Sequence, residues 1–192
     1  MGRWEPNAQA RLRQAALDLY SSRGFENTTV AEIAEAAGLT ERTFFRHFTD
    51  KREVLFAGSE RLQQLLAETA AASFEAAGPS GAVATAFEHA AQTYFPELPY
   101  ARQRQSIIDA NPPLQERELA KLNGVAAALA EVLRGRGVPE PSAAVAAESG
   151  VAAFKVAFAR WVTDPADRAL IDHMREAFDA QRLLFAAPTP TR

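Results

Sequence analysis

Cysteine is absent from the 192-residue sequence, and histidine occurs only three times. The chain therefore has no thiolate nucleophile, no disulfide framework and no Cys-ligated zinc site. The three histidines, His47, His89 and His173, lie far apart, and none belongs to a carboxylate–histidine motif typical of metal binding. We accordingly expect no metal and no cofactor.

Signatures of catalysis are missing as well. The sequence has no G-x-S-x-G motif, no phosphate-binding loop and no acid pair at helical spacing beside a histidine. We therefore predict that the chain is not an enzyme, and an all-helical enzyme remains as a remote alternative.

Long uninterrupted apolar runs and a secretory leader are also lacking. The richest apolar stretch, "SAAVAAESGVAAFKVAFARW", is interrupted by Glu148, Lys155 and Arg160, which does not fit a membrane span. The first residues have no apolar core of the kind that a secretory signal requires. With 47% hydrophobic residues the chain can still bury a large core. We expect a soluble, cytoplasmic protein that does not contact a membrane.

The sequence has no basic surplus, since its net charge is −3, and this argues at first sight against a nucleic-acid partner. The distribution of charge is more informative than the total. Residues 1–52 hold eight Lys/Arg and seven Asp/Glu, whereas the remainder holds thirteen and seventeen. Four of those eight cations, Arg42, Arg46, Lys51 and Arg52, fall within eleven positions. One short segment is therefore cationic within an acidic chain.

Strand patterns are absent, and the sequence reads as helix throughout, so we predict an all-α fold of nine helices. Three short helices are expected near residues 7–23, 29–37 and 40–48, with Gly24 and Gly38 ending the first two. Six longer helices follow, ending near residues 74, 95, 110, 134, 162 and 185. The predicted N-caps are Thr29, Thr40, Asp50 and Ser142.

The second and third short helices, joined by a tight turn at Gly38, fit a helix-turn-helix motif, whose second helix lies in the DNA major groove. Phe44 and Phe48 are four residues apart on one helix face and are predicted to be core. Phe45 lies about 100° around the helix and should point outward. An exposed phenylalanine between Arg42 and Arg46 suits a DNA groove, where it can touch a thymine methyl group.

The same face carries side chains that can read base edges. Arg42 and Arg46 match guanine, and Glu41 can accept from a cytosine amine. Thr29 and Thr40 place hydroxyls at helix N-termini, where phosphate contact is favourable, and Lys51 adds a point charge. Alternatively, the two threonines serve only as caps and the two arginines are solvated surface charges.

The segment "TTVAEIAEAAGLTERTFFRHFTDKREVLF" and the preceding "RLRQAALDLYSSRGFEN" resemble the DNA-binding region of the TetR (tetracycline-repressor) family of bacterial transcription regulators over about residues 10–56. This resemblance implies groove contacts from Glu41, Arg42, Phe45 and Arg46. It also implies phosphate contacts from Thr29, Thr40, Thr43, His47 and Lys51. Phe45 stands where the family most often has tyrosine, so the contact there should be apolar only.

The resemblance further implies a DNA-binding domain over residues 1–52 and a ligand-binding and dimerisation domain over 53–187. From its composition, the tail over 188–192 is expected to be disordered. The expected function is that of a homodimeric repressor, released from a palindromic operator by a small-molecule effector. A dimeric regulator with no ligand is the alternative.

Candidate residues for these roles in the larger domain come from helical faces and aromatic content. The expected ligand-pocket residues are Phe87, His89, Tyr94, Tyr100, Arg102 and Trp161. The expected dimer-interface residues are Ala146, Gly150, Phe154, Phe158, Met174 and Phe178. For Phe154 and Phe158, a place in the core of the single chain is an equally good interpretation.

Overall fold

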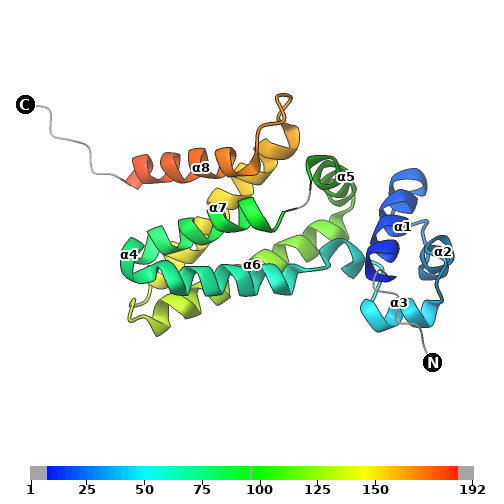
Figure 1. The fold of residues 1–192 in the computed structure, drawn as a ribbon, viewed down its shortest axis with the longest axis horizontal. Helices are drawn as coiled ribbons and strands as arrows, with labels where there is room; N and C mark the ends of the chain where they lie inside the picture. The colour runs from blue at the N-terminus through cyan, green and yellow to red at the C-terminus, as the bar shows by residue number, and fades with distance from the viewer. Residues whose placement is uncertain (1–7, 96, 186–192) are drawn as a thin grey trace, which may run out of the picture. The chain divides into compact units, whose positions relative to one another are not determined.

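A computed structural model describes residues 8–95 and 97–185, the side chain of Phe185 excepted, and is helical without a strand in these ranges (Figure 1). This confirms the predicted all-α class. The elements are α1 (Ala8–Arg23), α2 (Val30–Ala36), α3 (Glu41–His47), η1 (Glu53–Phe56), α4 (Ser59–Thr93), α5 (Leu98–Asp109), α6 (Pro112–Gly135), α7 (Ser142–Thr163) and α8 (Leu170–Phe185), where η1 is a 3₁₀ turn. The predicted disordered tail lies outside the described residues.

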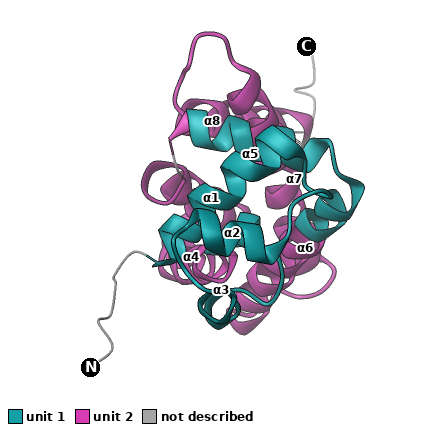
Figure 2. Cartoon of the chain, turned by 90° about the vertical axis from the view of Figure 1, so that its right-hand side faces the viewer, with its two compact units in different colours: residues 1–58, 99–119 teal, residues 59–98, 120–192 magenta. Residues whose placement is uncertain are grey.

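Two compact units make up the chain, and the first is discontinuous in sequence (Figure 2). The first unit comprises the chain up to Gly58 together with residues 99–119, and the second comprises residues 59–98 and those from Ala120 onward. This division differs from the predicted boundary after residue 52. The reason is that Ile107, Ile108 and Leu114 are buried in the same hydrophobic core as Leu12 and Phe44.

The start of the fourth helix differs from the prediction. Asp50 Oδ1 accepts the main-chain N–H groups of Arg52 (2.7 Å) and Glu53 (3.2 Å) beside the short turn η1, whose cap position is occupied by Arg52. Gly58 then adopts φ +92°, a left-handed conformation that ends this turn, and α4 begins at Ser59. The prediction that Asp50 caps the long helix was therefore wrong.

The long helix α4 contains a break that accounts for the difference between eight helices and the predicted nine. Gly78 has φ 68° and ψ 179°, which is not helical, and Pro79 follows it. Proline lacks a main-chain donor and fixes its own φ, so it suits the first position of a new helical segment. The stretch around "AAGPSG" thus separates two helical segments as expected, although both are counted within the single element α4.

In the second unit, α7 packs against α4 and α8. Gly150 permits a close approach, because a Cβ atom there would lie 2.2 Å from Val83 Cγ1. The helix begins at Ser142 itself, with Pro141 at the cap position, so the prediction of Ser142 as N-cap was wrong by one residue. Among the described residues, α7 alone is long and apolar enough to cross a membrane, by length and composition only.

A chain of aromatic rings runs through the core of the second unit. The ring centroids of Phe87 and Phe154 lie 5.4 Å apart, nearly parallel, and those of Phe154 and Phe158 lie 5.6 Å apart. Trp161 meets Phe158 edge-on at 5.4 Å, and Phe95 contacts both Phe154 and Phe158. Rings at these separations interact favourably beyond the area that they bury.

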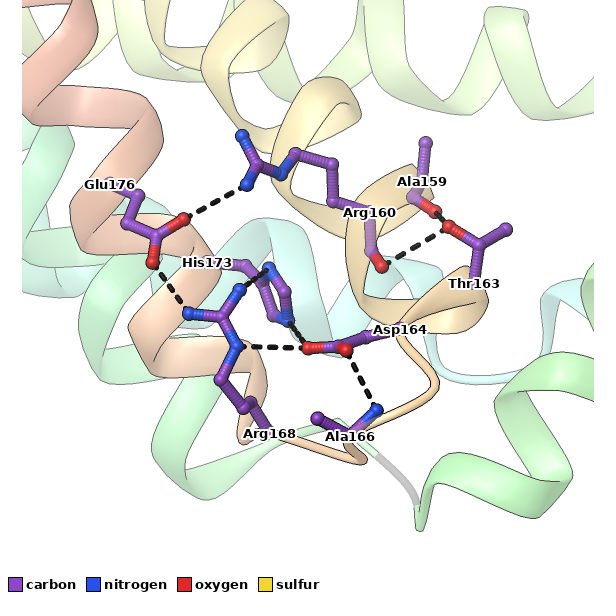
Figure 3. A network of polar contacts seen from close by, with 8 residues as sticks. All are labelled: Ala159, Arg160, Thr163, Asp164, Ala166, Arg168, His173 and Glu176. Carbon is purple, nitrogen blue, oxygen red and sulfur yellow. Dashed lines mark hydrogen bonds and ion pairs between the residues drawn. The ribbon is translucent and has the colours of Figure 1, made fainter.

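The turn between α7 and α8 is held by a network of charged side chains (Figure 3). Arg168 donates to Asp164 (2.9 Å) and to Glu176 (2.6 Å), and Arg160 also donates to Glu176 (3.2 Å). The buried His173 has Nε2 2.9 Å from Asp164 Oδ2. The main-chain N–H of Ala166, followed by Arg168, holds the pKa of Asp164 below its ordinary value. The network fixes the direction in which α8 leaves α7.

Candidate nucleic-acid interface

The N-terminus of α2 is held by a capping box, as the sequence predicts. The Thr29 main-chain N–H donates to Glu32 Oε2 (2.8 Å), and the Glu32 N–H donates to Thr29 Oγ1 (3.3 Å). The Thr29 hydroxyl also donates to Glu32 Oε2 (2.9 Å), and Arg23 pairs with the same carboxylate (3.1 Å). These bonds, those of Thr29 first, hold the pKa of Glu32 below its ordinary value. Thr29 remains exposed at this end of the helix.

The turn into α3 depends on Gly38, whose φ of +64° is a conformation that favours glycine. The Gly38 N–H donates to Glu35 O (2.8 Å), and the Leu39 N–H donates to Ala34 O (2.8 Å), which closes the end of α2. Arg11 of α1 donates to the carbonyl of Ala37. Thr40 then caps α3 by accepting the Thr43 N–H (3.2 Å), which confirms the predicted cap.

The two adjacent phenylalanines of α3 differ in burial, although their rings meet edge-on with centroids 5.5 Å apart. Phe44 is fully buried and Phe48 nearly so, whereas 54% of Phe45 is exposed. Phe44 packs on Phe48 with centroids 5.5 Å apart and belongs to the core of the first unit. The predicted assignment of Phe44 and Phe48 to the core and of Phe45 to the surface is confirmed.

The exposed face of α3 brings the predicted groove residues together. Glu41, Arg42, Phe45 and Arg46 are all exposed, as is His47, while Thr43 is half-buried. Within the part of the chain that the structure describes, neither Arg42 nor Arg46 takes part in an ion pair. One seven-residue helix thus presents two unpaired, exposed arginines together with an exposed aromatic ring.

Lys51 is placed differently from its neighbours in the predicted contact set. Its ammonium donates to the carbonyl oxygens of Phe25 (2.8 Å), Glu26 (3.3 Å) and Thr28 (2.9 Å), in the loop between α1 and α2. The Lys51 carbonyl in turn accepts the hydroxyl of Tyr20 (2.6 Å), and burial raises the pKa of that hydroxyl well above its ordinary value. The side chain that was predicted to face phosphate therefore binds main-chain carbonyls.

Polar contacts from residues 99–119 complete the first unit, and the sequence interpretation missed them. Arg104 donates to Leu55 O (2.7 Å), at the turn η1, and pairs with Glu118 (3.2 Å). Arg13 of α1 donates to the hydroxyl of Tyr100 (2.9 Å). These partners lie 14 to 87 positions apart in the chain, so no local sequence pattern could have indicated them.

The residues predicted to form the ligand pocket are divided between the two units. Tyr100 and Arg102 belong to α5 in the first unit. In the second unit, Phe87 and Trp161 are buried in the aromatic core, Tyr94 is half-buried and His89 is exposed. Of the predicted pocket residues, Phe87, Tyr94 and Trp161 belong to the aromatic core of the second unit. They are linked there through the rings of Phe95, Phe154 and Phe158.

The second unit contains a groove of about 610 Å³ at a different place. The groove is lined by Ser80, Gly81, Val83, Ala84, Pro141, Ser142, Val145, Ala146, Ser149, Gly150, Phe178, Gln181 and Arg182. Three of the predicted dimer-interface residues, Ala146, Gly150 and Phe178, line it. The other three predicted interface residues pack inside the single chain: Phe154 and Met174 are buried and Phe158 is half-buried. No cluster of side chains able to hold a metal ion occurs among the described residues.

Comparison with known proteins relates this geometry to a family. Residues 12–57 match the family described as bacterial regulatory proteins of the tetR family. Residues 77–183, more than half of the chain, match the family described as the MftR C-terminal domain. The HTH-type transcriptional regulator TcmR of Streptomyces glaucescens is 52% identical over 44 residues, which span 23% of this chain and 20% of that regulator.

Solved structures share the fold over nearly the full length. The Thermus thermophilus FadR, a TetR-family transcriptional repressor solved with lauroyl-CoA, aligns with a TM-score of 0.52 and 22% identity over 96% of this chain and 98% of that one. The SmeT–triclosan complex aligns with a TM-score of 0.63 and 20% identity over 96% and 99%. SmeT is the repressor of a multidrug efflux pump in Stenotrophomonas maltophilia. With its helix-turn-helix unit and its helical C-terminal unit, the chain belongs to the TetR family of DNA-binding transcriptional regulators.

Proposed function

We propose that the exposed face of α3 enters the DNA major groove and that Glu41, Arg42, Phe45 and Arg46 contact base edges there. The observation that carries this proposal is the exposed Phe45 between two unpaired arginines, on a helix whose opposite face is buried. Arginine binds guanine O6 and N7 together, and an apolar ring contacts a thymine methyl group. Thr29, Thr40, Thr43 and His47 flank this face and are proposed to contact phosphates. The chain thus acts by binding rather than by catalysis.

Selection of bound DNA from a random pool tests this assignment. The parent is expected to enrich an inverted repeat. Arg42→Ala and Arg46→Ala should each lose preference at a defined base pair, with a cost of about 1–3 kcal/mol for each bidentate hydrogen-bond pair that is removed. Arg134→Ala, at the exposed end of α6, is the matched control and should select the parental sequence. Unchanged selection by both α3 variants would contradict the assignment.

We further propose that the regulator is a homodimer formed through α7 and α8. Six large hydrophobic side chains of the described residues are exposed, and four of them lie on these two helices: Val145, Val156, Leu183 and Leu184. Exposed apolar side chains favour burial against a second copy. The predicted interface residues Met174 and Phe178 are buried within the chain and would support such an interface from beneath.

A small-molecule effector is proposed to act on the second unit and to release the protein, as a repressor, from a near-palindromic operator in the cytoplasm. The support is that two structures of the same fold carry small molecules in their complexes, lauroyl-CoA and triclosan. A ligand changes operator affinity only through a difference in its own affinity for the two states. A thermal-shift screen of small apolar compounds is the test, because binding to the native state raises Tm. Uniformly unchanged Tm would favour the regulator without a ligand.

A further inference from the structure

Lys51 is a half-buried lysine whose ammonium group is surrounded by main-chain carbonyl oxygens. A lysine ammonium carries three N–H donors and no acceptor. The carbonyl oxygens of Phe25, Glu26 and Thr28 lie 2.8, 3.3 and 2.9 Å from Nζ, so three acceptors match three donors. A phosphate oxygen would therefore have to displace one of these carbonyls.

Further interactions hold both ends of the residue. The ammonium lies 4.4 Å from the centre of the Phe25 ring, a cation–π interaction, and that ring meets Tyr20 edge-on at 5.2 Å. The main-chain carbonyl of Lys51 accepts the Tyr20 hydroxyl (2.6 Å). Lys51 thereby joins α1, the loop after it and the turn that leads into η1.

The ammonium supplies a charged donor to each of these carbonyl groups, and the Phe25 carbonyl also accepts the Thr28 N–H (3.3 Å). The three carbonyls converge from a four-residue span that ends directly before Thr29, where α2 is capped. Buried or partly buried carbonyls that lose their donors incur a desolvation penalty, and charged donors make the stronger bonds. Three carbonyls around one point suit the compact ammonium of lysine, whereas the planar fork of arginine suits bidentate acceptors.

We infer that Lys51 is a positioning residue for DNA binding and makes no phosphate contact of its own. By holding the loop 25–28 it fixes the capped first turn of α2, where the Thr29 hydroxyl would exchange its hydrogen bond to Glu32 Oε2 (2.9 Å) for one to a phosphate oxygen. The inference rests on the proposed DNA contacts, and it replaces the phosphate contact that the sequence resemblance implied for this residue.

The salt dependence of operator binding separates the two roles. A lysine that binds phosphate contributes to counterion release, so its removal lowers the slope of log K against log salt by about 0.9 for each phosphate that is no longer neutralised. Lys51→Met is expected to weaken binding by about tenfold, because Thr29 is no longer held in place, and to leave the slope at the parental value. Lys121→Met, in the second unit, is the control for removal of one lysine charge and should bind as the parent does.

Substitution of Lys51 by arginine also distinguishes a phosphate-binding role from a positioning role. If Lys51 bound phosphate, Lys51→Arg would keep that interaction and restore parental affinity and slope. Because a guanidinium does not fit the three carbonyls, we expect Lys51→Arg to bind as weakly as Lys51→Met, at the parental slope. A restored affinity, or a reduced slope in Lys51→Met, would overturn the inference.

A measurement without DNA decides the structural half of the inference. The chain has only three lysines, Lys51, Lys121 and Lys155, so the ¹⁵N signals of their ammonium groups can be assigned from the Lys51→Arg and Lys121→Met spectra. The Lys51 protons should exchange with water distinctly more slowly than those of the exposed Lys155. Equally fast exchange at Lys51 and Lys155 would overturn the inference. A folded parent that enriches no DNA would instead refute the proposed DNA-binding surface and leave this signal to decide the role of Lys51.

Discussion

At the residue scale, the pair Phe44 and Phe45 separates stability from recognition. Phe44→Ala removes a fully buried ring and should lower the free energy of unfolding by about 3–5 kcal/mol. Phe45→Ala removes a ring that is 54% exposed and should change that free energy by at most about 0.5 kcal/mol. Chemical denaturation measures both values.

Titration of Phe45→Ala with operator DNA completes the test. Phe45→Ala should bind its operator more weakly while remaining folded at the parental midpoint, since the ring no longer fills the groove and the core is unchanged. Parental affinity in Phe45→Ala would show that the ring does not touch DNA.

Sequence reasoning succeeds for these phenylalanines because their burial follows from helical spacing alone. Phe48 lies four positions after Phe44 on the same helix face, and one position places Phe45 about 100° around the helix. Lys51 could not be predicted in the same way. Its partners are main-chain carbonyls of residues 25, 26 and 28, and carbonyls carry no mark in the amino-acid sequence.

At the element scale, the capping box of α2 makes stability depend on pH. Because the pKa of Glu32 is lowered in the folded state, its contribution is present above the ordinary glutamate pKa of about 4.3 and is lost as pH falls through the folded value. Glu32→Gln keeps an oxygen acceptor for Thr29 but removes the charge beside Arg23. We expect this variant to be less stable at neutral pH and to lose less stability on acidification.

Urea denaturation at a series of pH values measures this effect. Glu35→Gln, an exposed glutamate on the same helix, is the matched control for the loss of one carboxylate. If the difference between parent and Glu32→Gln stayed constant from neutral to acid pH, the capping-box carboxylate would not be the source of the pH dependence.

Two glycines inside helices should respond to alanine in opposite ways. A Cβ at Gly150 would lie 2.2 Å from Val83 Cγ1 and 3.2 Å from Phe87, so Gly150→Ala should lower the free energy of unfolding by about 1–3 kcal/mol. At Gly124 the nearest atom is the flexible end of Gln63 at 3.4 Å, so Gly124→Ala should raise it by up to about 1 kcal/mol. Thermal and urea unfolding measure the change in the free energy of unfolding for both variants. A stabilised Gly150→Ala would contradict the close approach of α7 to α4.

Helix caps show where local patterns suffice and where they fail. Thr29 and Thr40 were predicted correctly, because each precedes a helix that starts with its own side-chain bond. Asp50 and Ser142 have the same chemistry, but Gly58 interrupts the chain after one and Pro141 occupies the cap position before the other. A cap residue indicates that a helix begins nearby, while the main-chain angles of the neighbouring Gly or Pro decide the first residue.

At the scale of the whole molecule, the proposed dimer can be tested through one exposed side chain. Val156 on α7 is 55% exposed, so Val156→Glu should leave the fold of the single chain intact but bury an unpaired charge on association. We expect a monomer in sedimentation and a large loss of affinity for the inverted repeat. Ala127→Glu, on the exposed side of α6, should remain dimeric. A dimeric Val156→Glu would exclude this part of α7 from the interface.

The return of residues 99–119 to the first unit limits how this regulator can be recombined with its relatives. A chimera joined after Gly58 would keep Leu12 and Phe44 but exchange Ile107, Ile108 and Leu114, which share their core, together with Arg104, which binds Leu55. Such a hybrid would carry mismatched halves of one core. A transplant of operator specificity that preserves the host fold should therefore move residues 99–119 along with the N-terminal helices, as a two-segment graft.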